Sequence, residues 1–213
     1  GICGATVTYV APVGADNCPG SVTNLIAGLT SGALFPVGTT TVTYEVTDAS
    51  GNTAQCSFDV TVNDTENPTI SCPGNITVSN DVGVCGALVN YIPPVGLDNC
   101  PGAVTVMIGG QASGTVFPVG TTTVTYEVTD AAGNVAQCSF DVTVNDTENP
   151  TIVCPANIVV SNDPGVCGAV VNYVAPVGLD NCPASVTTLF SGLASGSLFP
   201  IGTTTVTYEV TDA

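Results

Sequence analysis

The chain has 213 residues with 10 Cys, 24 Gly and 15 Pro, and its 17 acidic residues are opposed by no Lys, Arg or His, giving a formal net charge of −17. A surface without cationic side chains cannot neutralise phosphate, which excludes nucleic acid and anionic membrane surfaces as partners. Gly, Pro, Asn and Asp interrupt every apolar run well before about 18 residues, so no membrane insertion is predicted for this segment.

An internal repeat organises the chain. When the chain is aligned with itself at a shift of 82 residues, Cys3 lies opposite Cys85 and Cys167, and every Cys falls in one of four alignment columns. At the same shift, residues 50–82 match 132–164 at 27 of 33 positions. A period of this size indicates a tandem array of small domains. The predicted domains, called repeats 1, 2 and 3 below, are residues 1–63 (lacking a first strand), 64–145 (complete) and 146–213 (lacking a last strand).

Within repeat 2, apolar residues alternate with polar ones at the period of two that is typical of half-buried strands. Turn-forming residues separate the runs, and Asp, Gly and Asn at 129–134 predict a hairpin turn. In chain order, the expected strands are residues 75–79, 87–92, 104–108, a short piece around Val116, 123–128 and 139–144. Short strands without a helical period predict an all-β fold of tandem immunoglobulin-like β-sandwich domains, arranged as beads on a string.

The cysteines indicate disulfide bonds and therefore an oxidising, extracellular compartment. Zinc is the competing interpretation, and the absence of His and of Cys-x-x-Cys pairs argues against it. Four cysteines in one repeat allow three pairings. The expected neighbourhood of the first and last strands favours Cys72 with Cys138, which leaves Cys85 for Cys100, although the chain would then have to turn back after the second strand.

Five motifs occur in order along the chain and together resemble the hyalin repeat, or HYR, domain. In this sequence they are Gly83–Ala87, Asp98–Cys100, Phe117–Tyr126, Asp130–Val142 and Asp146–Pro155. The resemblance implies an immunoglobulin-like fold and a role in extracellular adhesion or matrix. Members of the family often lack the middle two cysteines together, which supports the pairings Cys3–Cys18, Cys72–Cys138, Cys85–Cys100 and Cys167–Cys182. Long arrays of near-identical copies occur in bacterial surface proteins, so a bacterial cell surface is the favoured location.

The linker at residues 60–70, repeated at 142–152, also resembles the calcium-binding linkers of cadherins. In an immunoglobulin-like sandwich, the start of the first strand and two loops meet at the pole that faces the preceding domain, and carboxylate and amide oxygens suit Ca²⁺. The simpler interpretation is that Asp and Asn only form turns there. The expected Ca²⁺ ligands are Asp64, Glu66, Asp98, Asn99, Asp130, Asn134, Asp146, Glu148, Asp180 and Asp212.

The sequence offers no catalytic or organic-cofactor site, because there is no His or Lys base and every acid recurs from repeat to repeat. We therefore expect a structural repeat region of an extracellular fibre or adhesin stalk, giving length and stiffness for cell-surface attachment. Its expected partners are neighbouring repeats, with lateral or end-to-end assembly into a fibre. The alternative is a repeat that itself contacts a surface glycan or a cell, for which an exposed aromatic platform would be typical.

Overall fold

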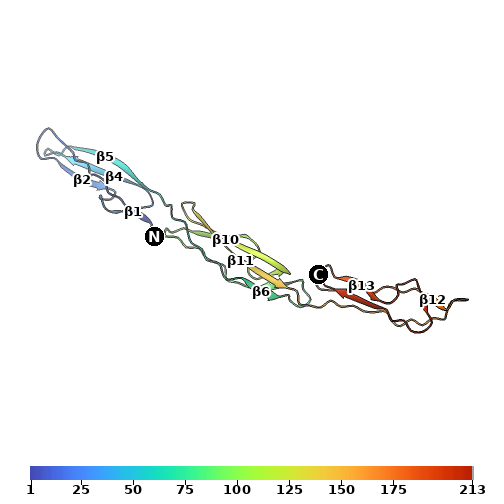
Figure 1. The fold of residues 1–213 in the computed structure, drawn as a ribbon. Coiled ribbons are helices and arrows are strands. Elements are labelled where there is room, and N and C mark those ends of the chain that lie inside the picture. Colours follow the sequence, from blue (N-terminus) through green and yellow to red (C-terminus); the bar gives the residue numbers. More distant parts are fainter. Residues whose placement is uncertain (213) are drawn as a thin grey trace. The chain divides into compact units, whose positions relative to one another are not determined.

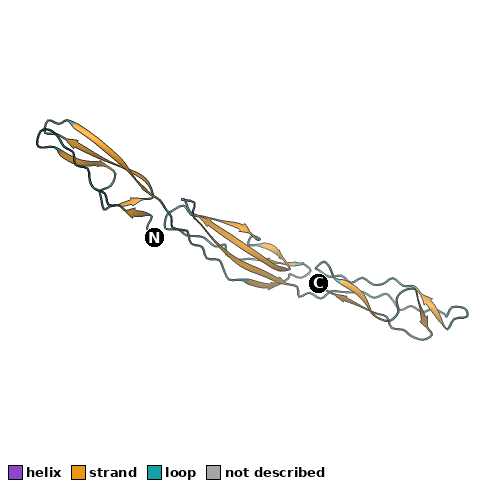
Figure 2. Cartoon of the chain, turned by 45° about the horizontal axis from the view of Figure 1, so that its top comes forward, coloured by secondary structure: helices purple, strands orange, loops and turns teal. Residues whose placement is uncertain are grey.

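The computed structural model describes residues 1–212, and every helix or strand assigned within them is a β-strand (Figure 1, Figure 2). The predicted all-β class of tandem immunoglobulin-like domains is confirmed. Ala213, the last residue of the predicted third repeat, lies outside the described residues.

The chain divides into two compact units, and repeat 2 contributes to both of them. The first unit consists of Gly1–Pro73, Pro93–Gly109 and Thr125–Ser139, and the second of Gly74–Ile92, Gly110–Val124 and Phe140–Ala213. Each unit therefore contains one junction between consecutive repeats together with the loops of repeat 2 that face it.

Repeat 1, in the first unit, shows the two layers of the sandwich. One layer is the antiparallel pair β1 (Gly4–Thr6) and β3 (Leu34–Pro36). The other is a sheet of β2 (Val22–Ala27), β4 (Gly38–Thr47) and β5 (Thr53–Val62), with β4 in the centre.

Aromatic and aliphatic side chains fill the space between these two layers. Phe35 from β3 meets Val42 and Tyr44 from β4, and all three are buried. Tyr9 packs edge-to-face on Phe35, Tyr44 and Phe58, with ring centroids 5.0 to 6.4 Å apart. Burial of this much apolar surface is the main stabilising contribution to such a small domain.

The six strands predicted for repeat 2 all form. A four-stranded sheet has the order β6-β11-β10-β8, and β7 pairs with β9. The register of β6 with the end of β11 is parallel, from Ile76 opposite Val142 to Ser79 opposite Asn145. The strands are β6 (Ile76–Ser79), β7 (Gly86–Val89), β8 (Val104–Gly109), β9 (Thr115–Pro118), β10 (Gly120–Thr129) and β11 (Val135–Asn145).

Strand β7 is shorter than predicted because, beyond Val89, a side chain makes the backbone hydrogen bonds that a neighbouring strand would otherwise make. The hydroxyl of Ser113 accepts a hydrogen bond from the Tyr91 N–H at 2.8 Å and donates to the Tyr91 carbonyl at 2.6 Å. The Tyr91 hydroxyl in turn donates to the carbonyl of Gln111 at 2.7 Å. The backbone therefore stays extended and hydrogen-bonded beyond Val89 without strand pairing.

Repeat 3, in the second unit, contains two antiparallel pairs. Strand β12 (Gly168–Val171) pairs with β14 (Ser197–Pro200), and β13 (Val186–Ser191) pairs with β15 (Thr207–Thr211). The segment of repeat 2 that forms β11 has no counterpart here, because residue 213 aligns with Ala131.

Candidate functional site: the junctions between repeats

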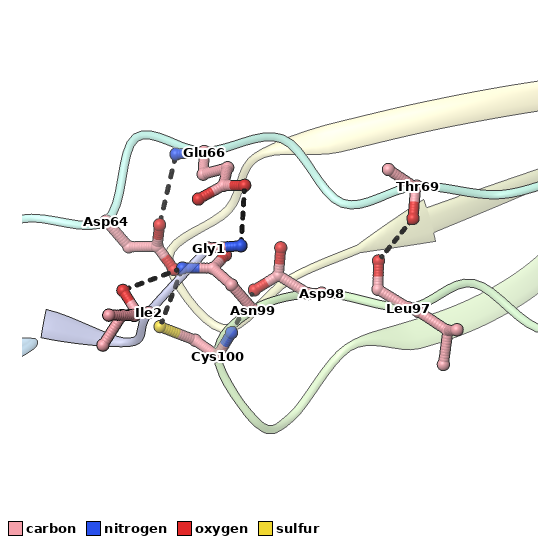
Figure 3. Close-up of polar contacts among 9 residues, drawn as sticks. All are labelled: Gly1, Ile2, Asp64, Glu66, Thr69, Leu97, Asp98, Asn99 and Cys100. Atoms are coloured by element: carbon pink, nitrogen blue, oxygen red, sulfur yellow. Dashed lines mark hydrogen bonds and ion pairs between the residues drawn. The ribbon is translucent and has the colours of Figure 1, made fainter.

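The linker after repeat 1 lies against the loop that precedes β8. The Thr69 N–H donates to the Leu97 carbonyl at 2.7 Å, and the Leu97 N–H donates back to the Thr69 carbonyl at 2.8 Å. This bridge brings Asp64 close to Asp98, so that one carboxylate oxygen of each lies within 4.8 Å of the other and of Cys100 Sγ (Figure 3). The second unit repeats the arrangement with Asp146, Asp180 and Cys182.

The turn between β10 and β11 reaches the same linker in the first unit. Asn134 donates through Nδ2 to the carbonyls of Asp64 and Glu66, both at 3.3 Å. The loops of repeat 2 predicted to share a pole are therefore brought together.

Asp130 organises this turn. Its side chain is only 6% exposed, Oδ1 accepts from the N–H groups of Ala132 and Asn134, and Oδ2 accepts from Asn134 Nδ2 at 2.8 Å. Burial acts to raise the pKa of Asp130, but hydrogen bonds from Asn134, Gly133 and Ala132 outweigh it and lower the pKa below its ordinary value. Both oxygens thus have N–H partners, which fits the turn-forming interpretation. Asp48 makes the corresponding bonds in repeat 1, and Asp212 occupies the same column directly after β15.

In the loop that carries Cys100 and in its counterpart in repeat 3, side-chain oxygens of the Asp-Asn pair before the cysteine lack a hydrogen-bond donor. In the second unit, Asp180 Oδ1 and Asn181 Oδ1 are buried and have no hydrogen-bond partner among the described residues. In the first unit, the Asn99 amide lies 3.1 and 3.2 Å from the two oxygens of Asp98. Rotating that amide by half a turn would place its nitrogen toward Asp98 and satisfy the carboxylate.

In both units such a rotation would break a hydrogen bond between repeats. The Asn181 Nδ2 donates to the carbonyl of Val84, in repeat 2, at 3.2 Å, just as Asn99 Nδ2 approaches the carbonyl of Ile2, in repeat 1, at 3.4 Å. Rotation would replace each inter-repeat hydrogen bond with a contact between two oxygens. A cation between the carboxylate and the amide oxygen would instead satisfy both while keeping the bond between repeats.

Each linker glutamate contacts a backbone nitrogen of the preceding repeat, and Glu148 also accepts from a side chain there. Glu148 Oε2 accepts from the Gly83 N–H at 2.8 Å and from Asn80 Nδ2 at 3.3 Å, and Asn80 Oδ1 accepts from the Thr147 N–H at 3.0 Å. Glu66 lies against Gly1, the counterpart of Gly83, with Oε1 at 3.5 Å from its nitrogen. Asn80 is not among the predicted site residues, and its only signal in the sequence is the repeated Ser-Asn-Asp at 79–81 and 161–163.

Disulfide bonds join consecutive repeats. Cys3 of repeat 1 is bonded to Cys100 of repeat 2, and Cys85 of repeat 2 to Cys182 of repeat 3, with a sequence separation of 97 in both cases. The predicted Cys72–Cys138 disulfide is confirmed, with a Cα–Cα distance of 5.6 Å. Cys18, Cys56, Cys154 and Cys167 are exposed free thiols.

Three predicted pairings are therefore wrong: Cys3–Cys18, Cys85–Cys100 and Cys167–Cys182. A disulfide needs Cα atoms within about 7 Å, whereas the extended segment between Cys85 and Cys100 carries the chain away from its start at about 3.3 Å per residue. The three predicted pairings place both cysteines in the same repeat. The same two alignment columns also meet across a junction, and this is the pairing that the structure shows.

Repeat 3 contains a cavity of about 840 Å³, lined in part by residues 154–162 and by Tyr173 and Tyr208. In the second unit the corresponding core of repeat 2 is closed by β11, whose Phe140, Val142 and Val144 are buried. The cavity is therefore the side of the repeat 3 core that no counterpart of β11 covers within residues 1–212, and its lining gives no reason to regard it as an active site.

The model of the HYR domain matches the chain over residues 1–62, 63–144 and 145–213. Hyalin of Strongylocentrotus purpuratus is 42% identical over 187 residues, covering 85% of this chain and 15% of the relative. Hyalin of Lytechinus variegatus is 35% identical over 219 residues, covering 100% of this chain and 41% of the relative. A serine-rich adhesin for platelets from Staphylococcus aureus is 30% identical over 164 residues, covering 64% of this chain and 7% of the relative. The favoured bacterial source is not supported, because the first of these relatives are animal proteins.

Among solved structures, extracellular cadherin domains 1–4 of protocadherin gamma B7 have 12% sequence identity and a TM-score of 0.35, covering 91% of this chain and 64% of that one. Within residues 1–212, no helix has the length and apolar character needed to cross a bilayer. The three consecutive matches, together with the strands and motifs described above, show that this chain belongs to the HYR domain family.

Proposed function

We propose that the chain is a structural segment of an extracellular fibre or adhesin stalk, which provides length and stiffness for attachment at a cell surface and has no catalytic role. One observation carries the proposal: consecutive repeats are joined by a disulfide in addition to the main chain. Such a bond is of use to a protein that must hold its repeats together under load, and it requires an oxidising compartment. The similarity to hyalins and to an adhesin supports an adhesion-related role outside the cell.

Calcium at the junctions is the second part of this proposal. The candidate ligands are Asp64 with Asp98 and Asn99, and Asp146 with Asp180 and Asn181. One oxygen of each of these carboxylates accepts a backbone N–H, and the other oxygen is the one offered to an ion. Carboxylate and amide oxygens are the ligands that Ca²⁺ prefers. Bound there, the ion would cancel the repulsion between two carboxylates in a chain of net charge −17 and tie the linker to the loop that carries the inter-repeat disulfide. The sulfur of Cys100 or Cys182 is not a ligand, because it is oxidised.

Calorimetric titration of the chain with CaCl₂ is expected to give one ion per junction. Asp98→Asn and Asp180→Asn should each abolish one of the two sites, because each replaces a carboxylate next to the facing amide oxygen. At a calcium concentration of about 100 times Kd, binding stabilises a folded unit by about 2.7 kcal/mol, so a chelator should lower the melting temperature.

The matched control is Asp141→Asn, which removes the same charge from a sheet, where Asp141 accepts the Thr123 hydroxyl at 2.7 Å. It should leave the calcium titration unchanged. The calcium proposal would be wrong if all three variants and the parent chain gave equal heats of calcium binding, or if a chelator left the melting temperature unchanged. The acids at the junctions would then serve only turn formation and solubility.

The alternative, a repeat that binds a glycan or a cell directly, has less support. Among residues 1–212, Phe190 is the exposed aromatic side chain, at 69% exposure, whereas the Tyr rings and the other Phe rings are buried or half-buried. A single aromatic ring at one repeat does not form the periodic platform that a glycan-binding array would need.

The stalk proposal is tested by presenting the fluorescently labelled chain to immobilised polysaccharides and to cells, with the Phe190→Ala variant alongside. We expect no saturable binding by either chain, because a stalk sets reach while another module chooses the partner. Saturable binding that Phe190→Ala removes would replace the stalk with the glycan-binding alternative.

A further inference from the structure

Residues 85–100 of repeat 2 are bonded at their two ends to two different repeats. Cys100 is linked to Cys3 in repeat 1, and Cys85 is linked to Cys182 in repeat 3. The shortest covalent route from repeat 1 to repeat 3 therefore runs from Cys3 through Cys100, back along the chain to Cys85, and on to Cys182. It bypasses residues 4–84 and 101–181 altogether.

We propose that this segment is the tension-bearing element of the array, and that the rest of each repeat is shielded from load once the segment is taut. The inference deepens the proposed function as a stalk and rests on it. Tension in a covalent network is carried by the shortest path once that path is fully extended. A segment of about 16 residues reaches no more than about 55 Å, whereas a full repeat of about 82 residues could extend to about 280 Å.

The local structure of the segment suits this role. Strand β7 pairs with β9 from Gly86 opposite Pro118 to Val89 opposite Thr115, and Ser113 holds the extended backbone at Tyr91. Pro93 and Pro94 fix their φ angles near −65°, which is compatible with extended chain and removes two backbone donors where strand pairing has already ended. The segment is therefore already extended when folded and has little length to release.

The third disulfide lies off this route. Cys72 and Cys138 join the beginning and the end of repeat 2 to each other, so their bond connects no two repeats. It stabilises the domain, and it limits the extension of the array only when both bonds between repeats are absent. The chain thus offers two disulfides on the path and one off it, which is a matched set for an experiment.

The exposed thiols of Cys18 and Cys167 provide handles at the two ends of the same route. Cys18 lies in the column of Cys100, and Cys167 in the column of Cys85, so residues 3–18 and 167–182 are the corresponding segments of repeats 1 and 3. Handles would be attached to these thiols by maleimide in a chain carrying Cys56→Ser and Cys154→Ser, and the molecule stretched in optical tweezers.

The parent chain is expected to reach a limit of about 160 Å, set by residues 3–18, 85–100 and 167–182. Cys3→Ser with Cys100→Ser should raise the limit to about 290 Å, and Cys85→Ser with Cys182→Ser should do the same. Each pair of substitutions removes one of the two disulfides on the short covalent route. Removing both bonds should leave the limit at about 290 Å, because Cys72–Cys138 then closes a route of similar length from residue 18 to residue 167. Removing all three bonds should give about 500 Å, roughly a threefold increase, for the full backbone between these residues.

Cys72→Ser with Cys138→Ser is the control and should leave the limit at about 160 Å even if the domain unfolds at lower force. A parent chain that extends to about 290 Å or beyond, or a control variant that extends beyond the parent, would overturn the proposal. The limit depends on covalent topology alone and needs no folded domain, so variants that fold poorly still report on it. Glycan binding would refute the stalk without changing this limit, and the two failures are therefore distinguishable.

Discussion

Phe117→Ala is expected to lower the free energy of unfolding by about 3 to 5 kcal/mol, the usual range for removing a fully buried aromatic ring from a core. Phe117 lies in β9 with 0% of its side chain exposed, and its counterpart Phe35 occupies the centre of the core of repeat 1. The change leaves a cavity next to β7, whose Ala87 is opposite Phe117 in the register. Chemical denaturation followed by tyrosine fluorescence measures the loss.

Two further Phe→Ala variants separate the effect of burial from that of residue type. Phe190 is 69% exposed, so Phe190→Ala should change stability by no more than about 0.5 kcal/mol. Phe199 occupies the column of Phe117 but is only half-buried, and its replacement should cost less than that of Phe117. Equal losses for Phe117→Ala and Phe190→Ala would show that the core is not where the structure places it.

Gly110→Ala should be the most damaging of the glycine substitutions in the turns of repeat 2. Gly110 has a φ of 83°, and a Cβ atom there would lie 2.6 Å from the Thr123 carbonyl oxygen and 2.7 Å from Val124 Cα. Both are backbone atoms of β10, so no side chain can rotate away, and the strand itself must shift. We expect a loss of about 1 to 3 kcal/mol from the steric clash, in addition to the cost of the left-handed backbone.

Gly133→Ala isolates that second cost. Gly133 has a φ of 94°, and a Cβ atom there would meet nothing within 4 Å. It should lose only the left-handed conformational penalty of about 1 to 2 kcal/mol. The difference between the two variants in thermal denaturation therefore measures the close approach of Gly110 to β10. If Gly133→Ala proved as destabilising as Gly110→Ala, the close packing would contribute nothing.

The period-two alternation was sufficient to predict the central strands of repeat 2. Val124, Tyr126 and Val128 in β10, and Phe140, Val142 and Val144 in β11, are all buried as the pattern predicts. The end of β7 was not predictable in the same way, because it depends on the hydroxyl of Ser113, which is distant in sequence and has no signature in the pattern. Local periodicity specifies which face of a strand is buried. A side chain that hydrogen-bonds the backbone in place of a neighbouring strand is brought there by the tertiary structure, so the local pattern does not reveal it.

For the candidate site, the sequence predicted which residues share a pole but not which cysteines are bonded. Asp64, Asp98 and Asn134 were expected at one pole from the order of loops in a sandwich, and the linker contacts bring them together. The partners of Cys85 and Cys100 were predicted wrongly, because a cysteine column states which positions are equivalent and not which repeat supplies the partner. That choice depends on which pole each cysteine occupies, a property of the folded domain.

The separation of 97 residues between bonded cysteines exceeds the repeat of 82, so the loop closed by Cys3 and Cys100 overlaps the loop closed by Cys85 and Cys182. Every peptide bond from Cys3 to Cys182 therefore lies inside at least one closed covalent ring. A protease that cuts this stretch once, in any exposed turn, leaves a single molecule whose two parts remain linked through sulfur. For a protein exposed to extracellular proteases, the overlap means that a single cleavage does not divide the molecule. Two cuts within the same ring are needed to release a fragment.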